Sequence, residues 1–461
     1  MSRADRTRLP EPGPAPGFRF PPGHKQQLAN GLCLWSVEQR ALPVVTFVLV
    51  LPVGSAADPE GRHGLVALTG DMLDEGSGDR SAIDVHEALA RIGARFDTEV
   101  NADATVLTLT TLARFRARGL SLLADCVVRP RLDARDFERV RHLRAMRLKQ
   151  LRDVPSAVAD WVFMRVLYGS HPYGHLALGS EAALQRMALD DVVVFHRAAC
   201  VPSGATLIAV GDIDADDLRQ IAADAFGEWS TPAGDGGAAG FRDAGRAAGP
   251  VLVPDRLTIV DKSGAAQSEV RIGHVGVARD IPEYHALVVL NTILGGQFVS
   301  RVNLKLRQEK GYTYGARTAF DFRRRPGPFL LQAAVQTGVT ADAIHDAMGE
   351  LRAIRTDRPP TPPELDLARA ALTRGYARNF ETPDQIARAL AQLVLYGLPD
   401  NCFDEFVPKV WEVDVEAARA AAVSHLHPDR MVTVIVGDSE AIRPLLARDG
   451  FGDPATVTAD L

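Results

Sequence analysis

The sequence has no apolar run long enough to cross a membrane. Its best stretch, Val44–Val53, is about ten residues long, whereas a membrane-spanning helix needs about 20. Such a short run better suits a buried strand. The N-terminal segment Met1–Gly17 carries no apolar core after its basic residues, so we expect no secretory signal. We therefore expect a cytoplasmic protein that has no membrane partner.

The chain also has few cysteines and no excess of positive charge. The four cysteines, Cys33, Cys126, Cys200 and Cys402, form no CxxC pair, which argues against a disulfide framework and a cysteine-only zinc site. The 52 Lys and Arg residues face 58 Asp and Glu residues, a net charge of −6, so we expect no nucleic-acid partner. Apolar residues make up 46% of the 461 residues, enough for large cores in two to four domains.

The most informative feature that is present is an internal repeat. Pro202–Asp212 (PSGATLIAVGD) and Pro428–Asp438 (PDRMVTVIVGD) each join an apolar strand to a Gly-Asp turn, at an offset of 226 residues. A domain of about 200 residues is therefore duplicated, because two further pairs follow in the same order at offsets of 222 and 218. These pairs are Leu65–Leu73 with Leu287–Gly295, and Gly93–Phe96 with Gly311–Tyr314.

The duplication predicts two homologous domains, at residues 25–229 and 251–461, after an N-terminal extension at 1–24. Residues 230–250 are rich in Gly, Ala and Pro and are typical of a flexible linker, which makes hinge motion a fair hypothesis. The GDGGAAG within them is not expected to bind phosphate, because no strand precedes it. Strands mixed with long helices predict an α+β fold, each domain a mixed, mainly antiparallel sheet covered by helices.

Local patterns predict the elements of the first domain. Residues 96–111 are β-branched and partly alternating, which indicates two strands that turn near 101–103. We also expect a strand at 43–51 and helices at 64–73, 82–92, 132–152 and 157–167.

Four segments carry a resemblance to a known family. They are Gly61–Ser77 (GRHGLVALTGDMLDEGS), Gly93–Thr105 (GARFDTEVNADAT), His171–Ser180 (HPYGHLALGS) and Leu290–Ala316 (LNTILGGQFVSRVNLKLRQEKGYTYGA). With them the chain resembles the insulinase/pitrilysin zinc metallopeptidases, which include the mitochondrial processing peptidase subunits. The resemblance covers roughly residues 25–437. It implies two tandem homologous domains that form one half of a clamshell.

Active members of that family carry an inverted zinc motif, H-x-x-E-H, on a helix. Its two His residues bind zinc from one helix face, its Glu is the general base, and a distal Glu is the third ligand. The alignment places the first His at Ala67, the Glu at Gly70 and the second His at Asp71. The distal Glu should fall near Met146 or Arg147, where no carboxylate stands. We expect no zinc and no catalytic residue in this chain.

Two other groups offer metal-ligand atoms. Asp71, Asp74 and Glu75 stand at i, i+3 and i+4 on the same predicted helix, but such carboxylates are usually only solvated. His171 and His175 of HPYGH need not share a face, because the proline between them forbids a regular helix. We interpret HPYGH as a turn before the next helix.

The resemblance gives the second domain a different role. In active members it contributes an Arg and a Tyr to the catalytic chamber, and Arg307 and Tyr314 match them in LRQEKGYTYG, with Tyr312 also available. A guanidinium can hold carbonyl or carboxylate oxygens of a substrate. A phenol can donate to the oxyanion that forms at a scissile carbonyl. Thr98–Thr105 resembles the edge strand to which active relatives add an extended peptide.

Together these features predict a non-catalytic, substrate-binding subunit of a heterodimeric zinc metalloendopeptidase. A partner chain with an intact H-x-x-E-H motif would hold the zinc and cut, while this chain would offer Arg307 and Tyr314 to an extended peptide. Two alternatives remain open: a scaffold subunit without a proteolytic role, and a peptide-binding chamber that acts alone as a homodimer. An independently active zinc peptidase is the least expected outcome.

Overall fold

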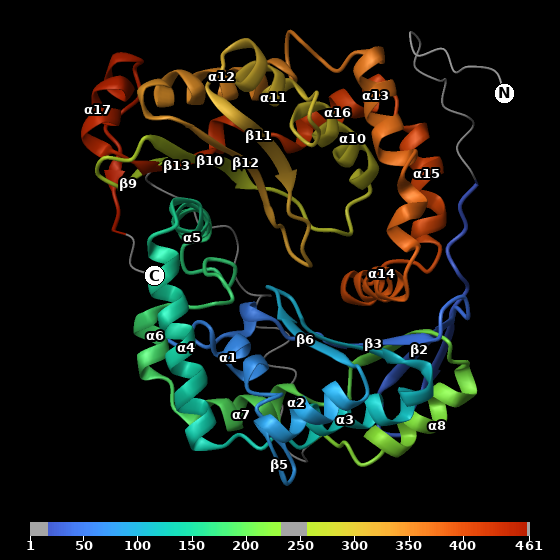
Figure 1. The fold of residues 1–461 in the computed structure, drawn as a ribbon. Coiled ribbons are helices and arrows are strands. Elements are labelled where there is room, and N and C mark those ends of the chain that lie inside the picture. The colour runs from blue at the N-terminus through green and yellow to red at the C-terminus, as the bar shows by residue number, and fades with distance from the viewer. Residues whose placement is uncertain (1–16, 232–255, 459–461) are drawn as a thin grey trace, which may run out of the picture.

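The computed structural model describes residues 17–231, here called the first half, and 256–458, called the second half (Figure 1). Residues 232–250 of the predicted linker and 1–16 of the predicted extension lie outside the described residues. The division of the chain at the linker therefore stays a prediction. The first half contains, in chain order, β1 (His24–Gln27), β2 (Cys33–Glu38), β3 (Val44–Leu51), α1 (Leu65–Asp71), β4 (Gly76–Ser77), β5 (Arg80–Ser81), α2 (Ala82–Arg91), β6 (Arg95–Val100), β7 (Thr105–Leu112), α3 (Arg116–Val128), α4 (Ala134–Arg152), α5 (Pro155–Tyr168), α6 (Glu181–Arg186), α7 (Leu189–Ala199), β8 (Thr206–Gly211) and α8 (Ala215–Phe226).

The second half repeats this pattern with changes in its helices. It contains β9 (Leu257–Asp261), β10 (Gln267–Val275), α10 (Tyr284–Leu294), α11 (Arg301–Asn303), the π-helical turn η3 (Leu304–Glu309), β11 (Thr313–Phe320), β12 (Pro328–Gln336), α12 (Thr340–Ala353), α13 (Pro362–Thr373), α14 (Pro383–Tyr396), α15 (Cys402–Glu412), α16 (Val415–His425), β13 (Val432–Gly437), α17 (Ser439–Arg448) and β14 (Ala455–Thr456).

Each half builds one six-stranded sheet. The sixth strands, β1 and β14, come from opposite ends of the chain, whereas the other five strands follow an equivalent order in the two sheets. The first is β6-β7-β3-β8-β2-β1 and the second is β11-β12-β10-β13-β9-β14. Both are mixed and mainly antiparallel, with parallel pairing of β2 with β8 in the first sheet and of β9 with β13 and β14 in the second. The repeated PSGATLIAVGD and PDRMVTVIVGD segments contain the equivalent strands β8 and β13. The predicted duplication and the α+β fold are confirmed.

The predicted elements of the first half agree with the observed ones to within about two residues. The helices expected from apolar spacing are α1, α2, α4 and α5, and the strand expected at 43–51 is β3. The predicted two-stranded unit is β6 and β7. Its turn is fixed by Asn101, whose side-chain oxygen accepts hydrogen bonds from the backbone amides of Asp103 and Ala104 (both 2.8 Å).

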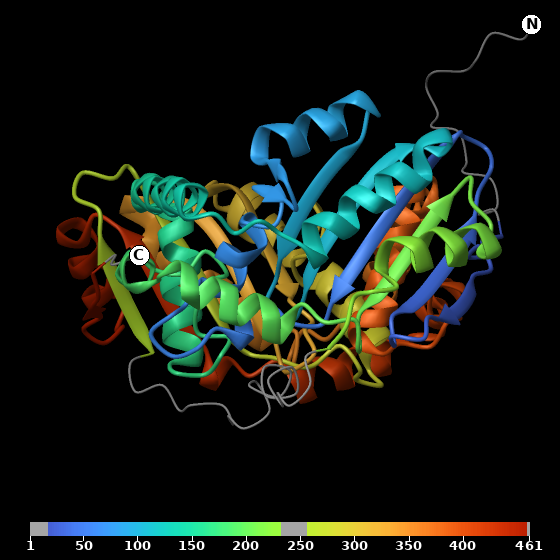
Figure 2. The ribbon, with the colours of Figure 1, turned by 90° about the horizontal axis from the view of Figure 1, so that it is seen from below.

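Each sheet is covered on one face by helices of its own half. On the outer face of the first sheet, α3 and α8 pack against β7 and β2; Figure 2 shows them in front of the sheet in cyan and green. The other face of each sheet is covered by one helix from the opposite half. Helix α5 packs on β10 and β13, and α14 packs on β3 and β8 (Figure 1).

These crossing helices bury apolar side chains that tie the halves together. Phe163 and Val162 of α5 lie in one core with Val434 of β13. Ile386 and Leu390 of α14 lie in another core with strands β3 and β8. Each such side chain contributes about 1.5–3 kcal/mol when it is fully buried. Because separating the halves would expose both cores, the two halves form one packed body.

The turns of two equivalent hairpins also meet between the halves. The carboxylate of Asp103, in the β6–β7 turn, accepts hydrogen bonds from the Tyr173 hydroxyl (2.5 Å) and from the Arg324 amide of the β11–β12 turn (2.9 Å). The Tyr168 hydroxyl donates to the carbonyl of Pro326 (2.9 Å). Burial raises the pKa of Tyr173, so its hydroxyl stays protonated and remains a donor. Hinge motion between the halves would have to break these contacts and expose both cores.

Candidate functional site

The positions of the zinc motif lie on α1 and are closed by neighbouring side chains. Ala67 is buried and has no ligand atom. At Gly70, a Cβ atom would lie 3.2 Å from the Cγ2 methyl groups of both Thr98 and Val100 on β6. A side chain at this position would require the two methyl groups to shift by a few tenths of an ångström, since the interior is closely packed there.

Asp71, in the position of the second His, forms an ion pair with Arg144 of α4. The Nη1 group of Arg144 donates to the Asp71 carboxylate, and its Nη2 group donates to the carbonyls of Ala177 and Leu178 (3.3 and 3.2 Å). The Arg144 side chain is 8% exposed, whereas that of Asp71 is 44% exposed. A guanidinium thus joins α1, α4 and the loop after HPYGH. The residues present do not fit a zinc ion, because Ala67 and Gly70 have no ligand atom and the one carboxylate, that of Asp71, is paired with a guanidinium.

The position of the distal Glu was expected near Met146 or Arg147, but both of these side chains are exposed. The buried stripe of α4 passes instead through Val140, Arg144 and Leu148. Residues spaced by three or four share one helix face, so Arg144 is the residue of this stripe that reaches α1. The sequence alignment alone missed Arg144. The signal that could have identified Arg144 is a basic residue on the buried stripe of α4, which needs an acidic partner such as Asp71.

The three carboxylates of the α1 region do not converge on a metal site. Asp71 is paired with Arg144, and Glu75 accepts a hydrogen bond from Arg139. Asp74 lies 3.8 Å from the Nε2 atom of His86. Burial raises the pKa of Asp74. Within residues 17–231 and 256–458, no group of three or more His, Cys, Asp or Glu side chains is placed to hold a metal ion.

The two histidines of HPYGH have separate structural partners. The Nδ1 atom of His171 accepts a hydrogen bond from the Tyr173 amide (3.0 Å). The Nε2 atom of His175 lies 2.9 Å from a carboxylate oxygen of the buried Asp58, which also accepts from the Gly64 amide at the start of α1. Burial lowers the pKa of His171. The segment forms turns that precede α6, as the sequence predicted.

In the second half, Arg307 lies in η3, and its guanidinium stacks on an aromatic ring without an ion pair to the described residues. Its guanidinium carbon lies 4.2 Å from the centre of the Phe298 ring, a cation–π contact. Among the residues that the structure describes, Arg307 has no carboxylate partner. Its side chain is partly buried and remains partly accessible to solvent.

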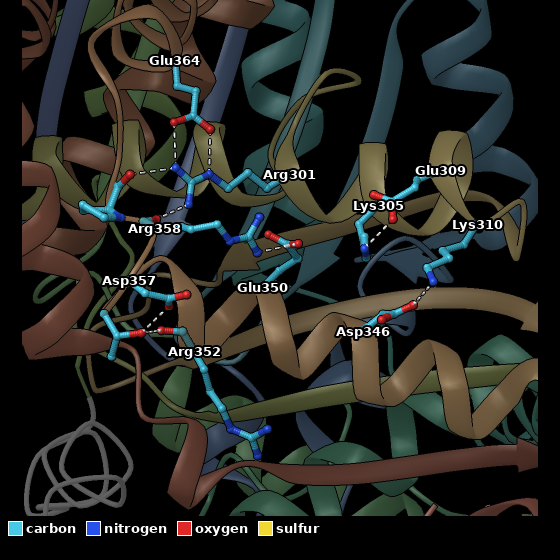
Figure 3. Close-up of polar contacts among 12 residues, drawn as sticks. Arg301, Lys305, Glu309, Lys310, Asp346, Glu350, Arg352, Asp357, Arg358 and Glu364 are labelled. Atoms are coloured by element: carbon cyan, nitrogen blue, oxygen red, sulfur yellow. Dashed lines mark hydrogen bonds and ion pairs between the residues drawn. The ribbon is translucent and has the colours of Figure 1, made fainter.

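Four cations on the segment that carries Arg307, or packed near it, form ion pairs, which Figure 3 shows. The ion pairs are Arg301 with Glu364 (2.6 Å), Lys305 with Glu309 (2.5 Å), Lys310 with Asp346 (3.8 Å) and Arg358 with Glu350 (2.8 Å). Arg307 differs from these four cations, because no ion pair neutralises its charge within the described residues. Its donors are available for an oxygen-bearing ligand.

Tyr314 is displayed by a β-bulge at the start of β11. The register shifts between Thr313 and Ala316, and the side chain of Tyr314 is 91% exposed. Without the extra residue, alternation would place Tyr314 on the core face with Ala316 and Phe320. Tyr312 is partly buried against the core of the second half. Of the two tyrosines, Tyr314 is therefore the one presented to solvent.

The two equivalent edge strands differ in how their outer sides are covered. Strand β6 is an edge that bonds only to β7 through its backbone among the described residues, so its outer side is open. It spans residues 95–100; the segment 98–105 named from the sequence includes the turn and the start of β7. On β11, the Thr318 amide donates to the Gly295 carbonyl (3.1 Å) and the Ala316 amide donates to the Asn303 side chain (3.0 Å). The β11 edge is closed there.

Comparison with known families agrees with this geometry. The family model described as "Insulinase (Peptidase family M16)" matches residues 36–174, and "Peptidase M16 inactive domain" matches residues 186–372. The chain belongs to peptidase family M16. The family predicted from the sequence is confirmed, and its α1 region departs from the family's zinc motif at Ala67, Gly70 and Asp71.

Similar M16 proteins carry contrasting names. An uncharacterized zinc protease of Mycobacterium tuberculosis is 26% identical over 394 residues, covering 85% of this chain and 88% of that protein. A non-peptidase homolog of Helicobacter pylori is 20% identical over 412 residues, covering 87% of this chain and 91% of that protein. The names describe those proteins and do not decide the activity of this one.

Solved structures share the fold over nearly the whole chain. A peptidase M16 inactive domain from Pseudomonas fluorescens has a TM-score of 0.81 at 25% identity, covering 91% of this chain and 98% of that one. A protease from Helicobacter pylori has a TM-score of 0.81 at 19% identity, covering 90% and 99%. In the described part of the chain, no helix has the length and apolar character required to cross a bilayer.

Proposed function

We propose that this M16 chain is the non-catalytic, substrate-binding subunit of a heterodimeric zinc metalloendopeptidase. The observation that carries the proposal is a contrast between two sites of this chain, one covered and one accessible. The zinc-motif positions are filled by an Asp71–Arg144 ion pair and by packing on β6. In contrast, Tyr314 is exposed, and Arg307, which stacks on Phe298, has no carboxylate partner within residues 17–231 and 256–458.

Zinc and the general base would come from the partner chain, which must carry an intact H-x-x-E-H motif. This chain offers none of the required ligand atoms at Ala67 or Gly70. Its cysteines are all free in the structure, which suits the reducing cytoplasm that we propose for the assembly. The substrate would be a peptide in an extended conformation.

The contribution of this chain would be to bind and orient that peptide. The guanidinium of Arg307 can donate to carbonyl or carboxylate oxygens, and the hydroxyl of Tyr314 can donate to a carbonyl oxygen. The open edge of β6 supplies unpaired backbone groups to which an extended chain can add. This mode of binding requires little sequence specificity, since main-chain groups are present in every peptide.

The test is turnover of a generic peptide by the assembled two-chain enzyme. Arg307→Ala and Tyr314→Phe should each lower kcat/KM by about 10- to 100-fold, the loss expected when one charged or oxyanion-directed hydrogen bond is removed. Lys310→Ala is the matched control, because Lys310 is already paired with Asp346. Unchanged turnover in both variants would contradict the roles assigned to Arg307 and Tyr314 and favour a scaffold subunit.

A further inference from the structure

A second arginine without a carboxylate partner lies beyond Tyr314 on the same strand. The Nε and Nη2 groups of Arg317 donate to the side-chain oxygen of Gln332 on β12 (2.7 and 2.6 Å), with the amide of Gln332 oriented to accept them. Arg317 pairs with Gln332 in register and is exposed, so it projects from the face opposite the core. The bulge places Tyr314 on this same exposed face. Arg307, on the turn η3 that contacts β11, and Arg317, on β11 itself, therefore both carry a charge that no carboxylate of the described chain neutralises.

Exposed apolar side chains stand beside these arginines. Phe298 and Val299, in the loop after α10, are 60% and 42% exposed, and the Phe298 ring is the surface on which Arg307 stacks. The nearly buried Asn303 fixes this loop, because its Nδ2 group donates to the Phe298 carbonyl (2.6 Å). The Oδ1 atom of Asn303 accepts from the amide of Ala316 on β11. One side chain thus holds both the loop and the strand in place before any ligand arrives.

We propose that this surface, the aromatic–arginine patch, binds peptides that carry a carboxylate next to a large apolar side chain. The patch consists of Phe298, Val299, Arg307, Tyr314 and Arg317. The inference rests on the proposed substrate-binding function and names the class of peptide. A carboxylate matches the planar donor fork of a guanidinium, and burying an apolar side chain against Phe298 removes exposed apolar surface from water.

The closed edge of β11 supports recognition through side chains. The amides of Ala316 and Thr318 are already bonded, so a peptide gains little by adding its main chain there. The equivalent face of β6 carries Arg95, Asp97 and Glu99 as exposed side chains, and Glu99 is paired with Arg388 of α14 (3.6 Å). The charges on that face of β6 are mixed, whereas the two arginines of the patch have no carboxylate partner in the described chain, so an acidic side chain of a peptide is attracted more strongly to the patch than to β6.

The experiment measures binding of fluorescein-labelled dodecapeptides to the full-length chain by fluorescence anisotropy at low salt. The reference peptide has a central Phe-Asp pair and blocked ends. Replacing its Asp by Asn should weaken binding about tenfold, and replacing its Phe by Ser should weaken it several-fold. A further pair of peptides ends in Phe with a free or an amidated C-terminus. A loss on amidation alone identifies the chain end as the source of the carboxylate.

Variants assign the effect to the patch. Arg307→Gln and Arg317→Gln should weaken binding of the Asp peptide and leave binding of the Asn peptide nearly unchanged. Lys310→Gln should change the binding of neither peptide. Phe298→Ala should weaken binding of the Phe peptide. Trp411→Ala is its control, since Trp411 is a second exposed aromatic ring that stacks on an arginine, Arg369, elsewhere in the second half.

The outcomes separate this inference from the function on which it rests. Equal binding of Asp and Asn peptides, with both weakened by Arg307→Gln, overturns the carboxylate preference and leaves the substrate-binding role intact. If none of the peptides binds, to the chain alone or with its partner, both the inference and the substrate-binding role fail.

Discussion

The two halves of the molecule build similar sheets, but their equivalent edge strands, β6 and β11, differ in which groups are covered and which are accessible. In the first half, α1 is closed by Arg144 and by the side chains of β6, while the backbone edge of β6 stays open. In the second half, the backbone edge of β11 is closed, while Tyr314 is exposed and the partly buried Arg307 has no carboxylate partner in the described chain. Equivalent edges of a duplicated fold can therefore differ in the groups that they present, because these depend on a few side chains and not on the sheet.

The crossing helices show no such divergence. Both α5 and α14 bury apolar faces on the sheet of the opposite half. This reciprocal covering leaves each sheet dependent on the other half for its second face. The fold is therefore stabilised as a unit, whatever the two edge strands bind.

The largest expected effect comes from breaking this reciprocal packing. Phe163→Ala, in a fully buried side chain of α5, should lower the free energy of unfolding by about 3–5 kcal/mol, the usual cost of removing a buried aromatic ring. Calorimetry should show one unfolding transition that shifts to lower temperature. Two separate transitions, of which only one shifts, would show that the halves unfold independently and would contradict the packed-body account.

A smaller loss of folding stability should follow from removing Arg144, the cation that pairs with Asp71 at the zinc-motif positions. Arg144→Ala should lower the free energy of unfolding by about 2 kcal/mol, less than the 3–5 kcal/mol typical of a fully buried pair because Asp71 is partly exposed. Arg147→Ala is the matched control on the same helix, where the side chain is exposed. Urea unfolding measures both variants. Equal stability of the two would show that Arg144 does not hold α1 to α4.

The smallest expected effect concerns zinc. Restoring only the letters of the motif, with Ala67→His, Gly70→Glu and Asp71→His, should give no stoichiometric zinc, because Arg144 remains and β6 crowds position 70. Adding Arg144→Glu removes the cation and supplies a carboxylate, and should raise the zinc content. Metal analysis after dialysis compares the two proteins. Full zinc loading of the triple variant would show that the site is still open.

The sequence predicted the repeat, the fold class and most elements of the first half, because these follow from local apolar spacing and turn residues. The β6–β7 turn at Asn101 and the missing ligands at Ala67 and Gly70 are of this kind. The sequence could not predict that Arg144 would meet Asp71, 73 residues away in the chain. Nor could it predict the bulge that exposes Tyr314, since both depend on how distant elements pack.

The central claim is that this chain binds substrate while another chain binds the zinc. Native mass spectrometry of the protein captured from its own cells reads the partner and the metal in one measurement. The account predicts a one-to-one complex with a second M16 chain, with zinc carried by that second chain alone. Zinc bound by this chain by itself would contradict the account, and a metal-free homodimer would replace the subunit role with that of a self-contained peptide-binding chamber.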